Sequence, residues 1–266
     1  AVTGMNYVFH LGAVIDAPDW ETYFRVNTLG TKNLIEACVE ANPGLRRFIY
    51  VSSIAAAGPS EKGILKSEKD EPRPVSLYGK SKLLAENIVN QYRHILPAVI
   101  IRLPNVLGVR QNKILSVLKL VKKRIIPLLG NGDKQTSICF VEDAVQALIL
   151  AAAKDKACGE TYFVTDDHTY SWRAMIDHIA EILGVGPFVL KLPYGAMLAV
   201  AGISEITASL AHSTALATRN EIRSSRKYYW LYDSQKIRQD LGFKPQINFE
   251  EGMKAIISWY KAKGLL

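Results

Sequence analysis

The chain has 266 residues and a mass of 29.5 kDa, enough to bury a sizeable core in one large domain or two joined ones. Its composition, 48% hydrophobic and 22% charged, is ordinary for a soluble globular enzyme. The net charge of +8 suits an anionic partner such as a dinucleotide, a nucleotide-linked substrate or an acidic membrane surface, although a merely basic surface explains it as well. The basic clusters at Lys122–Arg124 and Arg219–Lys227 lack the motif of a nucleic-acid-binding module, so we expect no nucleic-acid partner.

The first hundred residues alternate between apolar runs and helical patterns. Three short apolar runs predict buried strands: Tyr7–Leu11, Phe48–Val51 and Ala98–Arg102. Apolar residues at roughly helical spacing predict a helix over Glu21–Ala41, ended by Asn42, Pro43 and Gly44, and another over Leu77–Ile95. Near-continuous apolar strands that alternate with helices are typical of a parallel sheet covered on both faces. The sequence therefore predicts an α/β fold.

After Gly108 the pattern changes to shorter strands and more helices. Extended pieces are predicted at Ile125–Leu128, Ser137–Val141 and Thr161–Val164. Helices are predicted over Ile114–Lys123, Asp143–Ala153, Ser171–Leu183, 193–211, 234–241 and Phe249–Lys263. The pattern of this half predicts a smaller α/β lobe that is interleaved with the sheet domain and forms the other wall of a cleft.

The stretch from Tyr50 to Asn87 carries the clearest chemistry. It begins as an apolar strand that ends in Ser52 and Ser53, passes through a polar loop, and continues as a helix with Tyr78 and Lys82. Residues four apart lie on one helix face, so the Lys82 ammonium can lie beside the Tyr78 phenol and lower its pKa. A serine at the strand end could hold a carbonyl or alcohol oxygen next to that phenol. The pattern indicates proton transfer.

Tyr232 and Lys236 have the same spacing. No serine-tipped strand precedes them, so we interpret this second match as the start of a helix.

Cysteine and histidine usage gives expectations about compartment and metals. Cys38, Cys139 and Cys158 are far apart, which indicates a reducing compartment and buried thiols. The five histidines show no metal-ligand spacing, so we expect no metal. The N-terminus lacks a signal-peptide pattern, and the most apolar run, Leu192 to Ile203, is too short to span a bilayer. These features predict a cytoplasmic protein without an integral membrane segment.

Six short motifs follow one another along the chain: Tyr7–Ala13, Asn27–Asn33, Val51–Ser53, Tyr78–Lys82, Arg102–Gly108 and Phe140–Asp143. With these six motifs in this order, the sequence resembles the extended short-chain dehydrogenase/reductase superfamily, in its NAD-dependent epimerase/dehydratase group. The resemblance covers essentially the whole chain. Leu128–Asp133, Tyr170–Arg173 and Tyr232–Phe243 look more like the 3β-hydroxysteroid dehydrogenase and dihydroflavonol reductase branch than like the sugar-nucleotide epimerases.

This resemblance implies a Rossmann-like doubly wound parallel sheet with a smaller C-terminal α/β substrate lobe. Residues 1–110 would be the remainder of the dinucleotide-binding domain with the catalytic residues, and residues 111–266 the substrate-binding lobe, partly interleaved with it. The implied cofactor is NAD or NADP, and the implied partner is a small-molecule substrate. The resemblance also implies a homodimer in which the helices at Glu21–Ala41 and Leu77–Ile95 pair across a two-fold axis.

The resemblance also implies roles for single residues. Tyr78 would be the general acid/base, Lys82 would lower its pKa and bind the nicotinamide ribose, and Ser53 would hydrogen-bond the reacting oxygen. The implied cofactor-binding residues are Leu11, Gly12, Ala13, Val26, Asn27, Ser52, Tyr78, Lys82, Leu103, Pro104 and Asn105.

Several of these residues also have a purely structural interpretation. Ser53 could cap the next turn, Asn27 could make a structural hydrogen bond, and Ser52 more readily turns inward to stabilise the loop. His10 is better explained as a hydrogen-bonded core histidine than as a catalyst. Glu86, four residues after Lys82, would form an ion pair with it along the helix.

One feature of the family is missing. The family opens with a strand, a Gly-rich loop and a helix whose N-terminus holds the pyrophosphate. This chain begins just before what would be the fourth strand, and the residue that separates NAD from NADP is missing too. We therefore expect a fragment, or the ordered part, of a longer chain, with a long apolar sheet edge exposed.

Three functions remain open. The first is an NAD(P)-dependent oxidoreductase that interconverts a secondary alcohol and a ketone. The second is a nucleotide-sugar epimerase or dehydratase with tightly bound NAD, for which Arg110 would meet a substrate phosphate instead of being a surface arginine. The third is a non-catalytic dinucleotide-sensing protein. The apolar helix at 193–211 fits a hydrophobic substrate, a membrane surface or, equally, a core helix.

Overall fold

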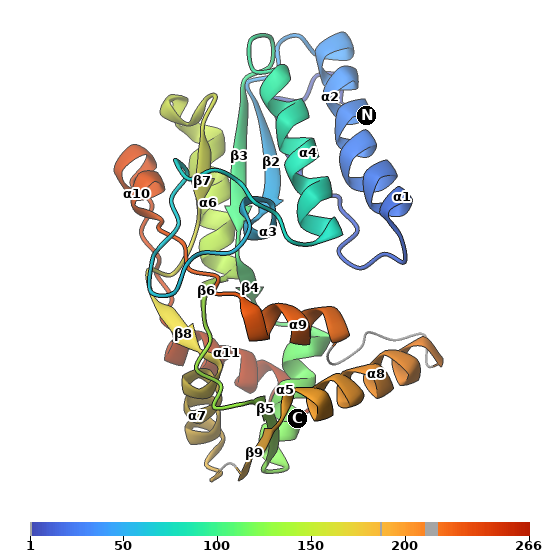
Figure 1. Ribbon diagram of the computed structural model, residues 1–266. Coiled ribbons are helices and arrows are strands. Elements are labelled where there is room, and N and C mark those ends of the chain that lie inside the picture. The colour runs from blue at the N-terminus through green and yellow to red at the C-terminus, as the bar shows by residue number, and fades with distance from the viewer. Residues whose placement is uncertain (1, 187, 211–217) are drawn as a thin grey trace. The chain divides into compact units, whose positions relative to one another are not determined.

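The computed structural model of the protein describes residues 2–186, 188–210 and 218–266 (Figure 1). The chain forms two compact units. The first unit comprises residues 1–106, 141–167 and 230–246, and the second comprises residues 107–140, 168–229 and 247–266. Neither unit is a continuous stretch of sequence. The functional roles expected for residues 1–110 and 111–266 stay predictions.

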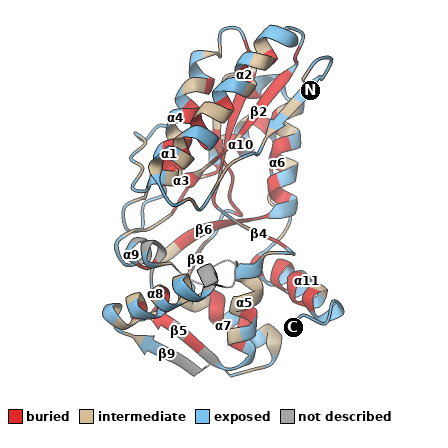
Figure 2. Cartoon of the chain, turned by 90° about the vertical axis from the view of Figure 1, so that its right-hand side faces the viewer, coloured by how far each residue is buried: buried red, intermediate tan, exposed pale blue. Residues whose placement is uncertain are grey.

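The first unit is built on a four-stranded sheet in the order β1-β2-β3-β7. Its strands are β1 (Tyr7–His10), β2 (Arg47–Ser53), β3 (Ala98–Leu103) and β7 (Thr161–Phe163). All three neighbouring pairs run parallel, which confirms the predicted α/β fold with a parallel sheet. Strand β2 is buried along most of its length, as Figure 2 shows. Strand β1 lies at one edge, where the side chains of Tyr7 and Phe9 are exposed.

Helices cover both faces of this sheet (Figure 1). The helical segments of the unit are α1 (Trp20–Tyr23), η1 (Phe24–Leu29), α2 (Gly30–Ala41), α3 (Ile54–Ala57), α4 (Leu77–Gln91), α6 (Val141–Ala153), η2 (Asp155–Ala157) and α10 (Gln235–Leu241). Helices α2 and α4 bury Ile35 and Val89 against Phe48 and Tyr50 of β2. Helix α6 contacts β2 and β3 from the other side. Burial of apolar side chains on both faces is what selects continuous apolar strands.

The predicted single helix at Glu21–Ala41 is interrupted. Between α1 and α2 the segment Phe24–Leu29 is π-helical, a conformation that widens the turn by one residue. Two buried side chains of this segment bond to α4. Thr28 donates to the Ser81 carbonyl at 3.0 Å, and the Asn27 amide donates to the Ser81 hydroxyl at 3.0 Å. These hydrogen bonds to α4 explain why Phe24–Leu29 is π-helical. The apolar periodicity of the segment does not predict them, because they involve another helix.

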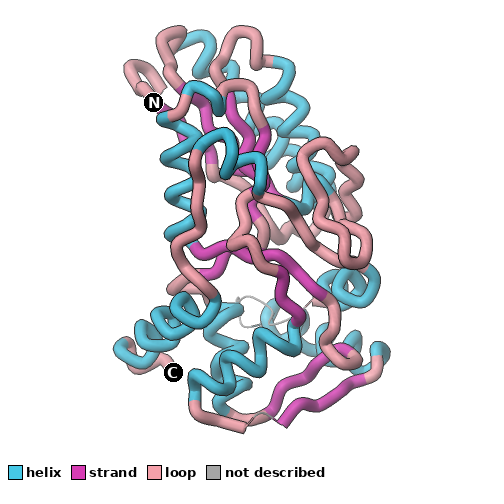
Figure 3. Tube along the Cα trace, turned by 90° about the vertical axis from the view of Figure 1, so that its left-hand side faces the viewer, coloured by secondary structure: helices cyan, strands magenta, loops and turns pink. Residues whose placement is uncertain are grey.

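The second unit contains five helices within its described residues: α5 (Asn112–Lys122), α7 (Trp172–Leu183), α8 (Tyr194–Leu210), α9 (Arg219–Lys227) and α11 (Phe249–Ala262). Its strands are β5 (Ile125–Leu129), β6 (Gln135–Phe140), β8 (Thr169–Ser171) and β9 (Phe188–Leu192), and β4 (Asn105–Leu107) crosses the boundary between the units. Strands β5 and β9 pair in parallel, and β6 and β8 pair antiparallel (Figure 3). The core gathers Leu118, Ile179 and Ile256 from α5, α7 and α11 around Phe140.

Helix α8 corresponds to the apolar helix predicted at 193–211, of which residue 211 lies outside the described part of the chain. Met197 and Ala201 are buried and pack with Ile222. Ile203 and Ile206 are 63% and 62% exposed. The helix is therefore a core element on one side and an open apolar surface on the other. Among the helices that the structure describes, none has the length and apolar character needed to cross a bilayer.

The cysteine prediction needs one correction. Cys38 and Cys139 are buried, as expected, but Cys158 is exposed. It follows η2 in the connection to β7, and connections run over the surface because buried loops leave backbone groups without hydrogen bonds.

Candidate active site

The predicted catalytic residues gather where β2 ends and α4 begins. Ser53 is the last residue of β2 and pairs in register with Leu103 of β3. Helix α4 starts after Ser76, whose hydroxyl accepts the Gly79 backbone N–H at 3.0 Å. This N-cap fixes the first turn of the helix, which carries Tyr78, while Lys82 follows one turn later.

A glycine is required next to Tyr78. A Cβ atom at Gly79 would lie 2.2 Å from the Ala55 carbonyl oxygen, a backbone atom of α3. Only glycine allows the start of α4 to pack this closely against the turn that follows Ser53. The Tyr-Gly pair in the sequence thus serves the geometry of the site.

Tyr78 is half-buried, and its ring lies 6.2 Å from that of Tyr23. Burial raises the pKa of Tyr78, and the nearby Ser53 hydroxyl opposes this rise. The predicted lowering of this pKa by Lys82 is not found here. The reason is the direction of Lys82, whose ammonium bonds elsewhere. The Ser53 hydroxyl also accepts the Ala55 N–H at 3.1 Å, so it caps α3 as the structural interpretation held.

Lys82 is 2% exposed. Its Nζ donates to the Val51 carbonyl at 2.8 Å and lies 4.2 Å from the centre of the Tyr50 ring. Burial lowers the pKa of Lys82 from 10.5 to about 8, and the charge of Glu86 partly opposes this. A lysine with this pKa loses its proton just above neutral pH.

The predicted ion pair between Lys82 and Glu86 is wrong. Glu86 accepts two hydrogen bonds from Arg102, at 2.7 and 3.0 Å, and one from the Ser52 hydroxyl at 2.6 Å. Arg102 reaches Glu86 because the parallel register places it beside Ser52 on the neighbouring strand, and its planar guanidinium suits a carboxylate better than an ammonium does. The Ser52 hydroxyl is therefore turned inward, as its structural interpretation proposed.

The residues predicted to touch the cofactor differ in accessibility. Leu11 is 59% exposed, and Gly12, Val26 and Asn105 are exposed as well. Ala13 and Leu103 are partly buried and Pro104 is buried. The loop after β1 and the loop after β3 follow the carboxyl ends of parallel strands, which is where ligands bind in open α/β sheets. Around Gly12, the nearest atom to an added Cβ would be in the His10 ring, at 3.6 Å, so the backbone there is not crowded by other groups.

Asn27, another of the predicted cofactor residues, is held by structural hydrogen bonds. It is 1% exposed, and its side-chain amide bonds to both the N–H and the carbonyl of Val14, at 2.8 and 2.9 Å. Together with its bond to Ser81, these contacts occupy the amide and hold the loop after β1 against α4. The structural interpretation of Asn27 accounts for all of them.

His10 also has a structural role. Its Nε2 is 2.9 Å from the Thr31 hydroxyl, and burial together with the charge of Lys82 lowers its pKa to about 4. The ring is neutral at neutral pH, in agreement with the expected core histidine.

The second Tyr-Lys pair is structural, as predicted. The buried Tyr232 hydroxyl donates to the Gly58 carbonyl at 2.7 Å, and Lys236 forms an ion pair with Glu160. Helix α10 begins at Gln235, between Tyr232 and Lys236, so this match is the start of a helix, as interpreted from the sequence.

Tyr50, Tyr23 and Arg102 are neighbours of the site that were not predicted from the sequence. In the sequence, Tyr50 and Arg102 stand in apolar strands and short motifs, and Tyr23 in a predicted helix, and none of the three was given a role in the site. Their positions beside Lys82, Tyr78 and Glu86 depend on strand register and helix packing. The four-residue spacing that singles out Tyr78 and Lys82 within one helix has no equivalent for residues from different elements.

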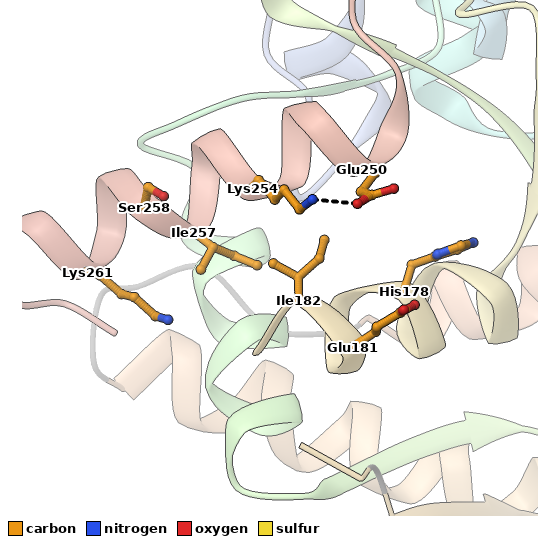
Figure 4. Close-up of a pocket in the computed structure, with 8 residues that line it drawn as sticks. All are labelled: His178, Glu181, Ile182, Glu250, Lys254, Ile257, Ser258 and Lys261. Atoms are coloured by element: carbon orange, nitrogen blue, oxygen red, sulfur yellow. Dashed lines mark hydrogen bonds and ion pairs between the residues drawn. The ribbon is translucent and has the colours of Figure 1, made fainter. Parts of the chain in front are cut away.

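A separate hollow of about 450 Å³ lies between α7 and α11 in the second unit (Figure 4). Its lining residues are His178, Glu181, Ile182, Glu250, Lys254, Ile257, Ser258 and Lys261. It contains none of the predicted site residues, and Glu250 and Lys254 form an ion pair within it. Across the described ranges, no cluster of three or more His, Cys, Asp or Glu side chains could hold a metal ion.

Replacing Lys82 by Met is expected to stabilise the fold below pH 8. The native Lys82 has a pKa near 8, whereas in the unfolded chain it holds its proton up to about 10.5. Stability of the unaltered protein should therefore rise with pH between 8 and 10.5. At about 1.4 kcal/mol per pH unit, the Met variant gains at most about 3 kcal/mol below pH 8. Denaturant unfolding at a series of pH values measures this, and equal pH profiles for the two proteins would contradict it.

Known enzymes and solved structures resemble this chain over most of its length. The chain is 27% identical to the 2-alkyl-3-oxoalkanoate reductase of Shewanella oneidensis over 277 residues, covering 96% of the chain and 70% of the reductase. It is 25% identical to a 3beta-hydroxysteroid-dehydrogenase/decarboxylase of Arabidopsis thaliana, covering 97% of the chain and 49% of that enzyme. The solved structure of MoeE5 with UDP-glucuronic acid and NAD superposes with a TM-score of 0.76 at 23% identity, over 98% of this chain and 81% of MoeE5.

The likeness to MoeE5 confirms the predicted Rossmann fold, and the description of the matching family as NAD dependent confirms the predicted nicotinamide cofactor. The family model described as NAD dependent epimerase/dehydratase matches residues 1–164. Residues of that range form the strands of the parallel sheet and carry Ser53, Tyr78 and Lys82. The chain belongs to the NAD dependent epimerase/dehydratase family.

Proposed function

We propose that the protein is an NAD(P)-dependent oxidoreductase that interconverts a secondary alcohol and a ketone. The observation that carries this proposal is the position of the Tyr78 phenol next to the Ser53 hydroxyl, with the buried Lys82 one helical turn further along α4. Similarity to the Shewanella reductase and the Arabidopsis dehydrogenase over nearly the whole chain supports it.

In this proposal the nicotinamide supplies or accepts the hydride at the substrate carbon. Tyr78 gives a proton to the oxygen of a ketone, or takes one from an alcohol. Ser53 donates a hydrogen bond to the same oxygen and holds it at the phenol. Lys82 holds its ammonium at the Val51 carbonyl, one helical turn from Tyr78, where it would bind the ribose of the nicotinamide cofactor.

The pKa values give the direction of the pH effects. Because burial raises the pKa of Tyr78, the phenol is protonated at neutral pH and ready to act as an acid on a ketone. Lys82 is mostly protonated below its pKa of about 8. Ketone reduction therefore requires Tyr78 and Lys82 in their protonated forms, which both hold below pH 8. Alcohol oxidation is favoured at a higher pH.

The cofactor contacts in this proposal come from Leu11, Gly12, Val26 and Asn105, which are exposed around the strand ends. Lys82 would meet the nicotinamide ribose. The choice between NAD and NADP, a homodimer formed through α2 and α4, and a cytoplasmic location are parts of the same proposal.

A nucleotide-sugar epimerase or dehydratase is the second candidate, favoured by the structural likeness to MoeE5 with its UDP-sugar and NAD. The same Tyr78 and Ser53 would then act in a transient oxidation that returns the cofactor to its starting state. Arg110 would contact the substrate phosphate.

One experiment separates the candidates. The protein is incubated with NADH or NADPH and a panel of 3-oxo acids and 3-oxosteroids, and with NAD and UDP-sugars. Loss of reduced nicotinamide in proportion to alcohol formed supports the oxidoreductase. A new sugar isomer without net change in nicotinamide supports the epimerase. Dinucleotide binding without any product would contradict both and leave the non-catalytic alternative.

A further inference from the structure

The Lys82 ammonium lies in a buried setting formed by three elements of the first unit. Tyr50 and the Val51 carbonyl come from β2, His10 comes from β1, and Glu86 lies one turn further along α4. Tyr78 lies one turn before Lys82 on the same helix. These are the charged and titratable groups that face Lys82 from the elements packed around it.

Few of these groups stabilise the positive charge directly. An ammonium has three N–H donors, and the Val51 carbonyl takes one at 2.8 Å. The oxygens of Glu86 are occupied by Arg102 and Ser52. His10 is neutral and cannot offset the charge, and its own pKa is lowered by Lys82.

The Tyr50 ring is the remaining contact. It is fully buried, and Lys82 Nζ lies 4.2 Å from its centre, well within the range over which an aromatic face attracts a cation. Burial strengthens this attraction because water does not compete for the charge. The ring also lies 5.6 Å from that of His10, so it is fixed between the two basic side chains.

The hydroxyl of Tyr50 contributes little to this arrangement. It is buried near Thr31 but forms no hydrogen bond of normal geometry in the described structure. The Thr31 hydroxyl is already bonded to the Asn27 carbonyl and to His10. Tyr50 therefore meets Lys82 through its ring and not through its hydroxyl.

We propose that Tyr50 is a positioning residue, whose ring carries the Lys82 ammonium and keeps it charged and directed to the Val51 carbonyl, one turn of α4 from Tyr78. The consequence for catalysis rests on the proposed function. The consequence for Lys82 itself does not, because it concerns the protein without cofactor or substrate.

The test compares three variants of the whole chain. Tyr50→Phe keeps the ring and removes the hydroxyl, and Tyr50→Leu removes the ring. Phe48→Leu is the matched control, since Phe48 is equally buried on the same face of β2 and in the same core cluster, two residues earlier. The readout is the pKa of Lys82, followed by NMR of lysine-labelled protein without cofactor and assigned with Lys82→Met.

Tyr50→Phe and Phe48→Leu are expected to keep the pKa of Lys82 near that of the unaltered protein. Tyr50→Leu is expected to lower it by about one unit, a tenfold change in the protonation equilibrium, because the charged form loses the ring. A Lys82 pKa in Tyr50→Leu equal to that in Phe48→Leu would overturn the proposal. If Tyr50→Leu does not fold, Tyr50→Met, which fills more of the volume, takes its place.

Turnover gives a second and separate readout. If the oxidoreductase activity is present, the pH profile of kcat should move to lower pH in Tyr50→Leu and stay in place in Tyr50→Phe. If neither the unaltered protein nor any variant shows activity, the proposed function fails. The pKa of Lys82 still decides whether the Tyr50 ring positions Lys82.

Discussion

Replacing Tyr78 by Phe is expected to reduce turnover by about 10²- to 10⁴-fold, the usual contribution of a positioned acid or base. The substitution removes only the hydroxyl that transfers the proton, and the ring keeps its packing against Tyr23. The melting temperature should therefore stay close to that of the unaltered protein. Steady-state rates with a ketone substrate and a thermal melt measure the two quantities.

Tyr232→Phe is the matched control, because Tyr232 begins the other Tyr-x-x-x-Lys sequence and is more deeply buried. Loss of its hydrogen bond to the Gly58 carbonyl should cost about 1 kcal/mol of stability and leave turnover largely unchanged. A Tyr78→Phe variant that turns over near the normal rate would remove Tyr78 from the catalytic role. Equal losses in both variants would point to a general effect on the fold.

Replacing Glu86 by Gln is expected to lower the free energy of unfolding by about 3 kcal/mol or more. Glu86 and Arg102 are both buried and form a two-point ion pair beneath the end of β2, and Ser52 adds a third hydrogen bond. The Gln side chain leaves the Arg102 charge buried without a counter-charge. Unfolding in urea, followed by circular dichroism, gives the difference.

Two further variants show that burial is the cause. Glu71→Gln breaks the ion pair with Arg73, in which both side chains are largely exposed, and should change stability by less than about 1 kcal/mol. A double Glu86→Met, Arg102→Met variant removes both buried charges and should be more stable than Glu86→Gln alone. The explanation fails if Glu86→Gln and Glu71→Gln have the same small effect.

Much of the first unit could be predicted because its elements are coded locally. The apolar runs at β1, β2 and β3 predicted parallel strands, and the structure has all three in adjacent positions. The short strands β4 and β8 were missed because neither is part of a continuous apolar run such as the one at Thr161–Val164, which predicted β7. Strand β9 was missed because it depends on pairing with β5, a distant segment.

The candidate site divides in the same way. Tyr78 and Lys82 could be selected because both lie on one helix, where the spacing of residues fixes their face. The ion-pair partner of Glu86 could not be predicted in this way, because the nearest cation along the helix is Lys82. The sheet register instead brings Arg102 to Glu86 from another strand. The pKa of Tyr78 was predicted in the wrong direction for a related reason, because burial of the phenol and the direction of Lys82 are properties of the packed site.

The sequence by itself determined the α/β class, the family resemblance and the Ser53, Tyr78 and Lys82 set. Each of these depends on residues within one strand or helix, or on motifs in a fixed order. Only the tertiary structure decided that Lys82 bonds to Val51 over the Tyr50 ring, that Ser52 and Arg102 hold Glu86, and that Asn27 ties a loop to α4. The physical reason is that a buried charge or amide takes the best partner in space, and strand register and helix packing bring that partner from elsewhere in the chain.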